Sequence, residues 1–192
     1  MSQGNGRVSL HDAKPSINRR YAAFQLRVGA STIHRWGIFA EEFVPKGRKV
    51  IEYTGEKISR RESKRRAEER AQIYLFTLNS YWTIDGAVGG SGAEIINHSC
   101  EPNVASRIVR EHILYYSTRD IQPGEELLVD YRFGYDEEKI PCDCGAKTCR
   151  GLMNLLRREQ GFLQRRGRHA EVQPREQLRF ARGSDTVFGP RG

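Results

Sequence analysis

Residues 97–103 read Asn-His-Ser-Cys-Glu-Pro-Asn, and residues 142–151 read Cys-Asp-Cys-Gly-Ala-Lys-Thr-Cys-Arg-Gly. Together the two stretches contain all the cysteines of the chain, which are Cys100, Cys142, Cys144 and Cys149. One lone cysteine and a C-x-C-x4-C triplet supply the four ligands of a single tetrahedral zinc site. Such a site would hold the end of the chain against its middle.

Two other interpretations use the same cysteines. Two disulfides would consume all four, but Cys142 and Cys144 are too close to pair easily. Residues 1–7 lack the apolar segment of a signal peptide, so we expect reduced thiols. Unligated thiols, one of them nucleophilic, are the third interpretation, although His98 is too near Cys100 in sequence to be assigned as its base without a fold. Zinc is favoured.

Length and charge bound the class of protein. The chain has 192 residues, 38% hydrophobic and 29% charged, which predicts one domain with a true core plus additional chain. No stretch approaches the roughly 20 apolar residues of a membrane span. The net charge of +8 divides into +4 for residues 1–30, −1 for residues 31–154 and +5 for residues 155–192. Basic flanks suit contact with nucleic acid or chromatin, or else serve as a solvated, solubilising tail.

The central block carries the pattern of short strands. Strands are predicted by alternation or short apolar runs at residues 24–28, 37–40, 49–53, 113–117 and 126–131. Turns are predicted at residues 45–47 and 122–125. One helix is clear, because Ser59 and Glu62 form a capping box and a charged, alanine-containing run continues to about Gln72. The sequence predicts a mainly β protein with few helices.

From about Tyr21 to Asn154 the chain resembles a SET domain followed by its zinc-binding post-SET segment, the family of protein-lysine methyltransferases. The motifs that carry the resemblance arrive in family order: residues 33–40 (IHRWGIFA), 50–56 (VIEYTGE), 74–76 (YLF), 84–86 (IDG), 97–103 (NHSCEPN), 124–131 (GEELLVDY) and 142–151 (CDCGAKTCRG). Most of these are short and weak alone. The cysteine-containing pair, in this order, is specific.

The resemblance implies a mainly β fold of several small curved sheets and few short helices, with a C-terminal pseudoknot that places the NHSC string beside the strand ending in Tyr131. Threading of this kind is rare among folds. It also suggests a division of the chain into a flexible basic arm at 1–20, a SET domain at 21–138, a post-SET zinc segment at 139–156 and a basic Arg- and Gly-containing tail at 157–192.

The activity implied is methyl transfer from S-adenosylmethionine to a lysine amine. Tyr131 matches the tyrosine whose hydroxyl lies beside the transferring methyl group, and Tyr53 matches a tyrosine of the lysine channel, although core packing also explains a tyrosine there. The positions that match cofactor-binding residues are His34, Arg35, Trp36, Gly37, Tyr74, Asn97, His98 and Asp143. Without the motif, His98 would be interpreted as a core histidine. The zinc ligands implied are Cys100, Cys142, Cys144 and Cys149, with one structural ion.

The sequence departs from the family pattern in three places. The cofactor loop commonly reads G-x-G, and Arg35 replaces the first glycine, so we expect cofactor contacts to persist if Arg35 adopts an ordinary φ. Residues 90–95 read GSGAEI where G-N-x-x-R-F is common, so Glu94 reverses a charge. Val129 stands two residues before Tyr131, where Phe or Tyr often limits product methylation; a smaller residue predicts that di- or trimethylation is not blocked.

Partners and location follow from the same resemblance. A protein substrate with a target lysine is expected, with histones or other basic, nucleic-acid-associated proteins as the family default, and non-specific nucleic-acid contact through the basic termini. No membrane is expected. The location expected is intracellular: nuclear or chromosomal in a eukaryote, cytoplasmic in a microbe. A non-catalytic SET-type binding module is the second hypothesis. A doubly wound methyltransferase is rejected, because the glycines at 89–92 lead into no helix of useful length.

Overall fold

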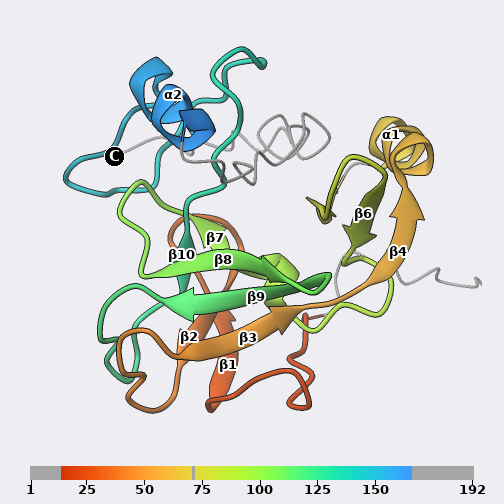
Figure 1. The fold of residues 1–192 in the computed structure, drawn as a ribbon. Helices are drawn as coiled ribbons and strands as arrows, with labels where there is room; N and C mark the ends of the chain where they lie inside the picture. Colours follow the sequence, from red (N-terminus) through yellow and green to blue (C-terminus); the bar gives the residue numbers. More distant parts are fainter. Residues whose placement is uncertain (1–13, 71, 166–192) are drawn as a thin grey trace, which may run out of the picture.

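The structure is a computed structural model that describes residues 14–70 and 72–165. Within them the chain forms three small sheets (Figure 1). The first is a hairpin of β1 (Leu26–Ala30) and β2 (Trp36–Ala40). The third contains β4 (Glu56–Ser59), β6 (Trp82–Asp85) and β5 (Leu75–Thr77). The prediction of a mainly β protein built from small sheets is confirmed.

The second sheet has five strands in the order β3-β9-β8-β10-β7. Its strands are β3 (Lys49–Tyr53), β7 (Asn97–His98), β8 (Val104–Val109), β9 (His112–Ser117) and β10 (Leu128–Val129). Strand β10 lies between β7 and β8 and runs parallel to both. In the sequence, however, β7 and β8 are joined directly by a loop, and β10 comes only later. Ser99 N–H donates to Val129 O at 3.0 Å, and Asn103 N–H donates to Leu128 O at 3.1 Å, so the connecting loop holds β10 from both sides. This insertion is the expected pseudoknot.

The core lies between the hairpin and the five-stranded sheet. Val44, Val50, Ile51 and Ile38 have no exposed surface, and they belong to one cluster that includes residues of β2, β3, β8, β9 and β10. The β3 side chains at Val50, Ile51 and Tyr53 are all buried, so this strand is covered on both faces. Burial of such apolar side chains is the main favourable contribution to folding.

The helices are few. They are α1 (Arg60–Glu69), the 3-10 turn η1 (Ala93–Ile95) and α2 (Arg157–Arg165). In Figure 1, α1 lies with the three-stranded sheet at the upper right of the view, and α2 lies at the upper left, beyond β7 and β10. Within the described residues, no helix has the length and apolarity of a membrane span.

Most predicted strands are present with shifted ends. The strand at 49–53 is confirmed, and that at 113–117 begins one residue earlier. The strand predicted at 24–28 forms at 26–30 instead. Of the strand predicted at 126–131, only Leu128–Val129 forms β10. The residues before it hydrogen-bond to β2 instead: Ala40 N–H donates to Glu125 O at 2.9 Å, and Leu127 N–H donates to Ile38 O at 2.7 Å.

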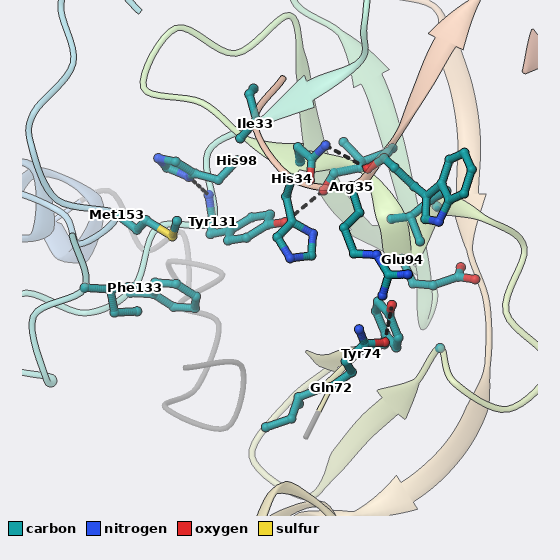
Figure 2. A pocket seen from close by; sticks show the side chains of 18 of the residues that line it. Ile33, His34, Arg35, Gln72, Tyr74, Glu94, His98, Tyr131, Phe133 and Met153 are labelled. Atoms are coloured by element: carbon teal, nitrogen blue, oxygen red, sulfur yellow. Dashed lines mark hydrogen bonds between the residues drawn. The ribbon is translucent and has the colours of Figure 1, made fainter. Parts of the chain in front are cut away.

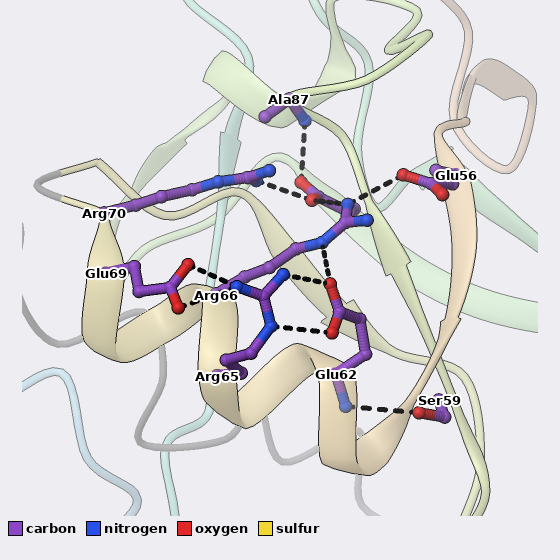
Figure 3. A network of polar contacts seen from close by, with 9 residues as sticks. Glu56, Ser59, Glu62, Arg65, Arg66, Glu69, Arg70 and Ala87 are labelled. Carbon is purple, nitrogen blue, oxygen red and sulfur yellow. Dashed lines mark hydrogen bonds and ion pairs between the residues drawn. The ribbon is translucent and has the colours of Figure 1, made fainter.

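Helix α1 begins as its capping box predicts. Ser59 Oγ accepts the Glu62 N–H at 3.1 Å. The reciprocal half of the box does not form, because the Glu62 carboxylate is taken by Arg65 and Arg66 at 2.7 and 2.8 Å (Figure 3). These guanidinium contacts lower the pKa of Glu62 to about 2. The helix ends at Glu69, and the backbone of Arg70 is extended. The helix is therefore shorter than predicted, since the sequence indicated a run to about Gln72.

A buried carboxylate attaches α1 to the three-stranded sheet. Asp85, with no exposed surface, accepts from Arg66 and Arg70, each at 2.6 Å, and its other oxygen accepts the Ala87 N–H at 3.1 Å (Figure 3). Replacing Asp85 with alanine leaves two guanidinium groups without their shared anion. Arg66 keeps its contacts with Glu56 and Glu62, so we expect a loss of about 1–3 kcal/mol in the free energy of unfolding.

Chemical denaturation measures this loss. Glu69→Ala is the control, because Glu69 pairs with Arg65 at the surface, with both side chains 55% exposed. We expect a much smaller change from that variant. Equal effects of the two substitutions would show that burial of the Asp85 pair contributes nothing.

The predicted division of the chain at residues 20, 138 and 156 stays a prediction. Within its first segment, Ile17 packs on the core and Asn18 N–H donates to Ser91 O at 2.9 Å. Residues 1–13 of the basic arm and residues 166–192 of the basic tail lie outside the described residues.

Candidate active site

A cleft of about 1310 Å³ opens where distant parts of the chain meet. Its wall combines the loop before β2, the end of β3, the segments around β5 and η1, strand β7, and the chain from Tyr131 to Met153. Figure 2 shows Tyr131, His34, Arg35 and Tyr74 directed into the same space. A cleft of this size and mixed lining is typical of a cofactor or substrate site.

Tyr131 is fixed at three points in this wall. Its hydroxyl donates to Ile96 O at 2.9 Å, and its N–H donates to His98 Nδ1 at 3.1 Å. Its ring meets the edges of His98 and Phe133, with centroids 5.2 and 5.7 Å away. Burial raises the pKa of the Tyr131 hydroxyl above its usual range, so the group stays neutral. Because its proton is donated to a carbonyl, the oxygen offers only lone pairs to a ligand.

Tyr53 has the same arrangement. Its hydroxyl donates to Tyr74 O at 2.6 Å, its ring lies 5.4 Å from that of Phe76, and its side chain lines the cleft although the residue is only 5% exposed. Burial, and then the charge of Glu94, raise the pKa of Tyr53 well above its usual value. Tyr53 therefore packs in the core and also faces the cleft, and its role in a lysine channel stays a prediction.

Glu126 joins the predicted cofactor loop to β7, a role that the sequence did not reveal. Asn97 Nδ2 donates to Trp36 O at 2.9 Å and to Glu126 Oε1 at 2.8 Å, while Ser31 Oγ donates to Glu126 Oε2 at 3.0 Å. Gly37 lies behind the wall and not among the lining residues, and a Cβ there would collide with the Glu126 carboxylate. Glu126 thus positions Asn97 and the main chain of the loop together.

His98 is buried and neutral. Burial lowers its pKa to about 4, and Nδ1 accepts the Tyr131 N–H, so the ring proton sits on Nε2. Nε2 lies 3.6 Å from Cys100 Sγ. The histidine therefore lies between the backbone of Tyr131 and the cysteine cluster.

Four of the predicted cofactor residues form one side of the cleft: His34, Arg35, Trp36 and Tyr74. Burial, followed by the charge of Arg35, lowers the pKa of His34, and burial raises that of Tyr74. We expected the loop contacts to persist if Arg35 adopted an ordinary φ. The structure differs, because the φ of Arg35 is 24°. The backbone there keeps the conformation that favours glycine.

This strain is testable by comparing two substitutions at one position. We expect Arg35→Gly to be more stable than Arg35→Ala by about 1 kcal/mol, because only alanine retains a Cβ at positive φ. Denaturant unfolding measures the difference. At Arg27, inside strand β1, the same pair of substitutions should give the opposite order, since glycine weakens a strand. Alanine being the more stable at both positions would refute the argument.

The four cysteines form one cluster, and none of them is in a disulfide. All four sulfur atoms lie within 4.8 Å of one another, with Cys100 Sγ 3.8 Å from Cys142 Sγ and 4.0 Å from Cys149 Sγ. A tetrahedron of zinc–sulfur bonds of about 2.3 Å requires sulfurs about 3.8 Å apart. The Cys100 N–H donates to Cys144 Sγ at 3.4 Å, and the Arg150 N–H donates to Cys100 Sγ at 3.4 Å. The donor set fits a zinc ion.

The cysteine segment also forms part of the cleft. Cys142, Asp143, Cys144 and Met153 line it, although Asp143 is itself exposed. Arg150, next to Cys149, makes a two-point ion pair with Asp130, next to Tyr131, at 2.8 Å for each contact. Sequence reasoning missed this pair and the apolar lining from Phe133, Ile140 and Met153, because none of them carries a chemical signature of its own.

The threaded β fold with its tyrosine-lined cleft places the chain in the SET class of proteins. The family model described as the SET domain matches residues 35–132. The chain belongs to the SET domain family.

Three relatives illustrate the similarity. The chain is 43% identical over 139 residues to a Schizosaccharomyces pombe protein named histone-lysine N-methyltransferase, H3 lysine-4 specific, covering 68% of this chain and 15% of that protein. It is 40% identical over 163 residues to Oryza sativa histone-lysine N-methyltransferase TRX1, and the match covers 79% of this chain and 16% of that protein. The chain thus spans about a sixth of these relatives' length. A crystal structure of an active polycomb repressive complex 2 in the stimulated state matches at 35% identity, with a TM-score of 0.54, over 58% of this chain and 15% of that one.

Proposed function

We propose that the protein is an S-adenosylmethionine-dependent protein-lysine N-methyltransferase. The observation that carries the proposal is the pair of buried cleft tyrosines, Tyr131 and Tyr53, whose hydroxyl protons are both held by backbone carbonyls. Their oxygens are left as fixed acceptors in an aromatic channel. The names of the relatives support the same activity.

The chain's own residues fit the cofactor. His34, Arg35, Trp36, Tyr74, Asn97, His98 and Asp143 all line the cleft and would bind it, while Gly37 permits the loop to lie close to Glu126. When bound, S-adenosylmethionine supplies the methyl group that is transferred. Asn97 is held by Trp36 O and Glu126 at 2.9 and 2.8 Å, so its position is fixed before any ligand arrives. Such preorganisation lowers the cost of binding.

The substrate lysine must reach the site as a neutral amine. An ordinary lysine with a pKa near 10.4 must give up a proton at a cost of roughly 4–5 kcal/mol at pH 7. The aromatic and apolar wall of Tyr53, Tyr131 and Ile96 disfavours the charged form. The oxygens of Tyr53 and Tyr131 then accept the amine N–H groups and orient the nitrogen lone pair. Proximity and orientation supply the catalysis, with no protein nucleophile.

The four cysteines are proposed to hold one zinc ion that folds residues 140–153 over the cleft. Structural zinc of this kind contributes directly to folding, because the unfolded chain has no preformed site. The ion has no part in the methyl transfer itself. Its effect on catalysis would pass through Arg150 and Asp130 to the neighbouring Tyr131.

Histones or similar basic proteins are the proposed substrates, with a nuclear, chromatin-associated location. The names of the relatives support this choice, and the fission yeast name specifies lysine 4 of histone H3. The basic termini are proposed to contact nucleic acid through their arginines.

Transfer of labelled methyl groups to core histones tests the function. We expect incorporation into histone lysines by the wild-type protein, and stoichiometric binding of the cofactor product S-adenosylhomocysteine. Binding without methylation of any histone or proteome extract would favour the non-catalytic module. Failure to bind the cofactor product would refute the enzyme.

Product state is a separate prediction. Val129 is 3% exposed, belongs to the core cluster and is not among the residues that line the cleft, so it does not narrow the channel. Mass spectrometry of a histone peptide should therefore reveal di- or trimethyl-lysine at long times. A strictly monomethylated product would contradict the prediction.

A further inference from the structure

Glu94 lies in the cleft wall without a cation to neutralise it. It belongs to the 3-10 turn η1 and lines the cleft with Tyr53 and Tyr74. Its Oε2 accepts the Gly92 N–H at 2.8 Å, and within residues 14–70 and 72–165 it makes no ion pair. Asp85, the buried acid of the same region, is paired with two arginines. A partly buried carboxylate without such partners is costly unless a ligand supplies them.

Two glycines pack closely around this carboxylate, and neither position has room for a Cβ. A Cβ on Gly90 would lie 2.6 Å from Glu94 Oε1. A Cβ on Gly86 would lie 2.8 Å from the Glu94 Cβ and 2.7 Å from the Tyr53 hydroxyl oxygen. Glu94 and Tyr53 thus both pack against Gly86 in the same part of the cleft wall. Because the Tyr53 proton is held by Tyr74 O, both groups present acceptors to the cleft.

A carboxylate and a tyrosine lone pair on the same part of the cleft wall suit a group that carries several N–H donors and a positive charge. We propose that Glu94 binds an ammonium group in the cleft. The inference rests on the proposed function, which brings two such groups to the site: the amino group of the cofactor's methionine part and the ε-ammonium of the target lysine. Both share the chemistry that Glu94 and Tyr53 recognise. In the second case Glu94 would also accept the lysine proton, so that an N–H bond breaks and a Glu94 O–H bond forms before the nitrogen attacks the methyl carbon.

The protonation of Glu94 gives the inference a pH signature. Burial raises the pKa of Glu94 to about 7. Below that pH the carboxyl is neutral and attracts an ammonium group weakly, so affinity should rise as pH increases through about 7. The stability of the ligand-free protein should change with pH in the opposite direction. Because folding raises the pKa of Glu94 from 4.5 to about 7, the free energy of unfolding should fall as pH rises through this range.

The other titratable or charged groups around this part of the cleft behave differently. Tyr53 on β3 and Tyr74 before β5 have raised pKa values and stay neutral below pH 9. Burial, followed by the charge of Arg35, lowers the pKa of His34, so His34 is already neutral at the pH where Glu94 ionises. Arg35 remains a cation throughout. Asp85 is held by Arg66 and Arg70.

The test compares wild type, Glu94→Gln and the control Glu69→Gln, an exposed acid at the cleft rim, at pH 6 and pH 8. Calorimetry measures the affinity for S-adenosylhomocysteine, which carries the amino group but no sulfonium. Steady-state kinetics measure the KM of a histone peptide. Thermal melts without ligand measure stability. We expect Glu94→Gln to melt higher than wild type at pH 8, with the gap shrinking toward pH 5, and Glu69→Gln to match wild type throughout.

The two sources of the ammonium group give different results. If Glu94 binds the cofactor, Glu94→Gln should weaken S-adenosylhomocysteine about tenfold or more and abolish its pH dependence, with peptide KM unchanged. If Glu94 binds the lysine, cofactor affinity should stay constant while peptide KM rises about tenfold and the alkaline rise of kcat is lost. If Glu94→Gln is active and both its affinity for S-adenosylhomocysteine and its peptide KM lie within twofold of wild type, the inference is wrong but the proposed function stands. A wild-type protein that neither binds the cofactor product nor methylates would overturn the proposed function and the inference together.

Discussion

Replacing Tyr131 with phenylalanine is expected to lower the rate of methyl transfer by about 100- to 1000-fold, the usual effect of removing one preorganised polar group from a reacting centre. The substitution deletes the oxygen that faces the cleft and leaves Ile96 O without its donor at 2.9 Å. The ring contacts with His98 and Phe133 persist, so the fold should survive. Single-turnover assays with labelled cofactor measure the rate.

A matched substitution separates this effect from general damage. Tyr116→Phe makes the same chemical change on strand β9, at a residue whose ring faces Arg107 at 4.9 Å and does not line the cleft. We expect its rate to equal that of wild type, and both variants to bind S-adenosylhomocysteine within twofold of wild type. A loss of less than threefold in Tyr131→Phe would remove Tyr131 from the mechanism.

Cys142→Ser is expected to abolish methyl transfer and to destabilise the end of the domain. Cys142 is 5% exposed, lies 3.8 Å from Cys100 at the sulfur atoms and has both its own side chain and its neighbour Asp143 in the cleft wall. Without its thiolate the zinc site has three ligands. Because binding energy at a structural zinc site is folding energy, the segment from Ile140 to Met153 should detach from the cleft.

Elemental analysis, thermal melts and methyl-transfer assays measure the three consequences. Lys147→Ala is the control, since Lys147 is exposed in the same loop and offers no ligand. We expect it to retain one zinc per chain and full activity. Chelation of wild type should reproduce the cysteine variant. Activity that survives complete removal of the metal would refute the coupling through Arg150 and Asp130.

Local signals in the sequence predicted some elements and not others. The strand Lys49–Tyr53 and the start of α1 were predictable, because an apolar run and an N-terminal cap act within a few residues. Strand β8 was not predicted. Its hairpin turns at Arg110 and Glu111, both at positive φ, where glycine or asparagine is the usual signal. Helix α2 was also missed, because Gly161 lies in its middle and interrupts an otherwise helical stretch.

The same distinction explains the site. The cysteine cluster was predictable from ligand count and spacing, and the cleft tyrosines from motif order. Glu126 was not, since its role arises only where Ser31, Asn97 and the carboxylate meet from three distant segments. Glu94 was noticed as a reversed charge, but that it forms no ion pair within the described residues depends on the packing around η1.

The insertion of β10 between β7 and β8 has a consequence for biosynthesis. Loop 99–103 holds Leu128 and Val129 in the finished fold, and Tyr131 and three of the four cysteines follow these two residues in the sequence, so they are synthesised later. A nascent chain that stops before about residue 150 therefore lacks the cysteine segment that lines the cleft. The methyl transfer proposed above would then require that the whole domain has been translated.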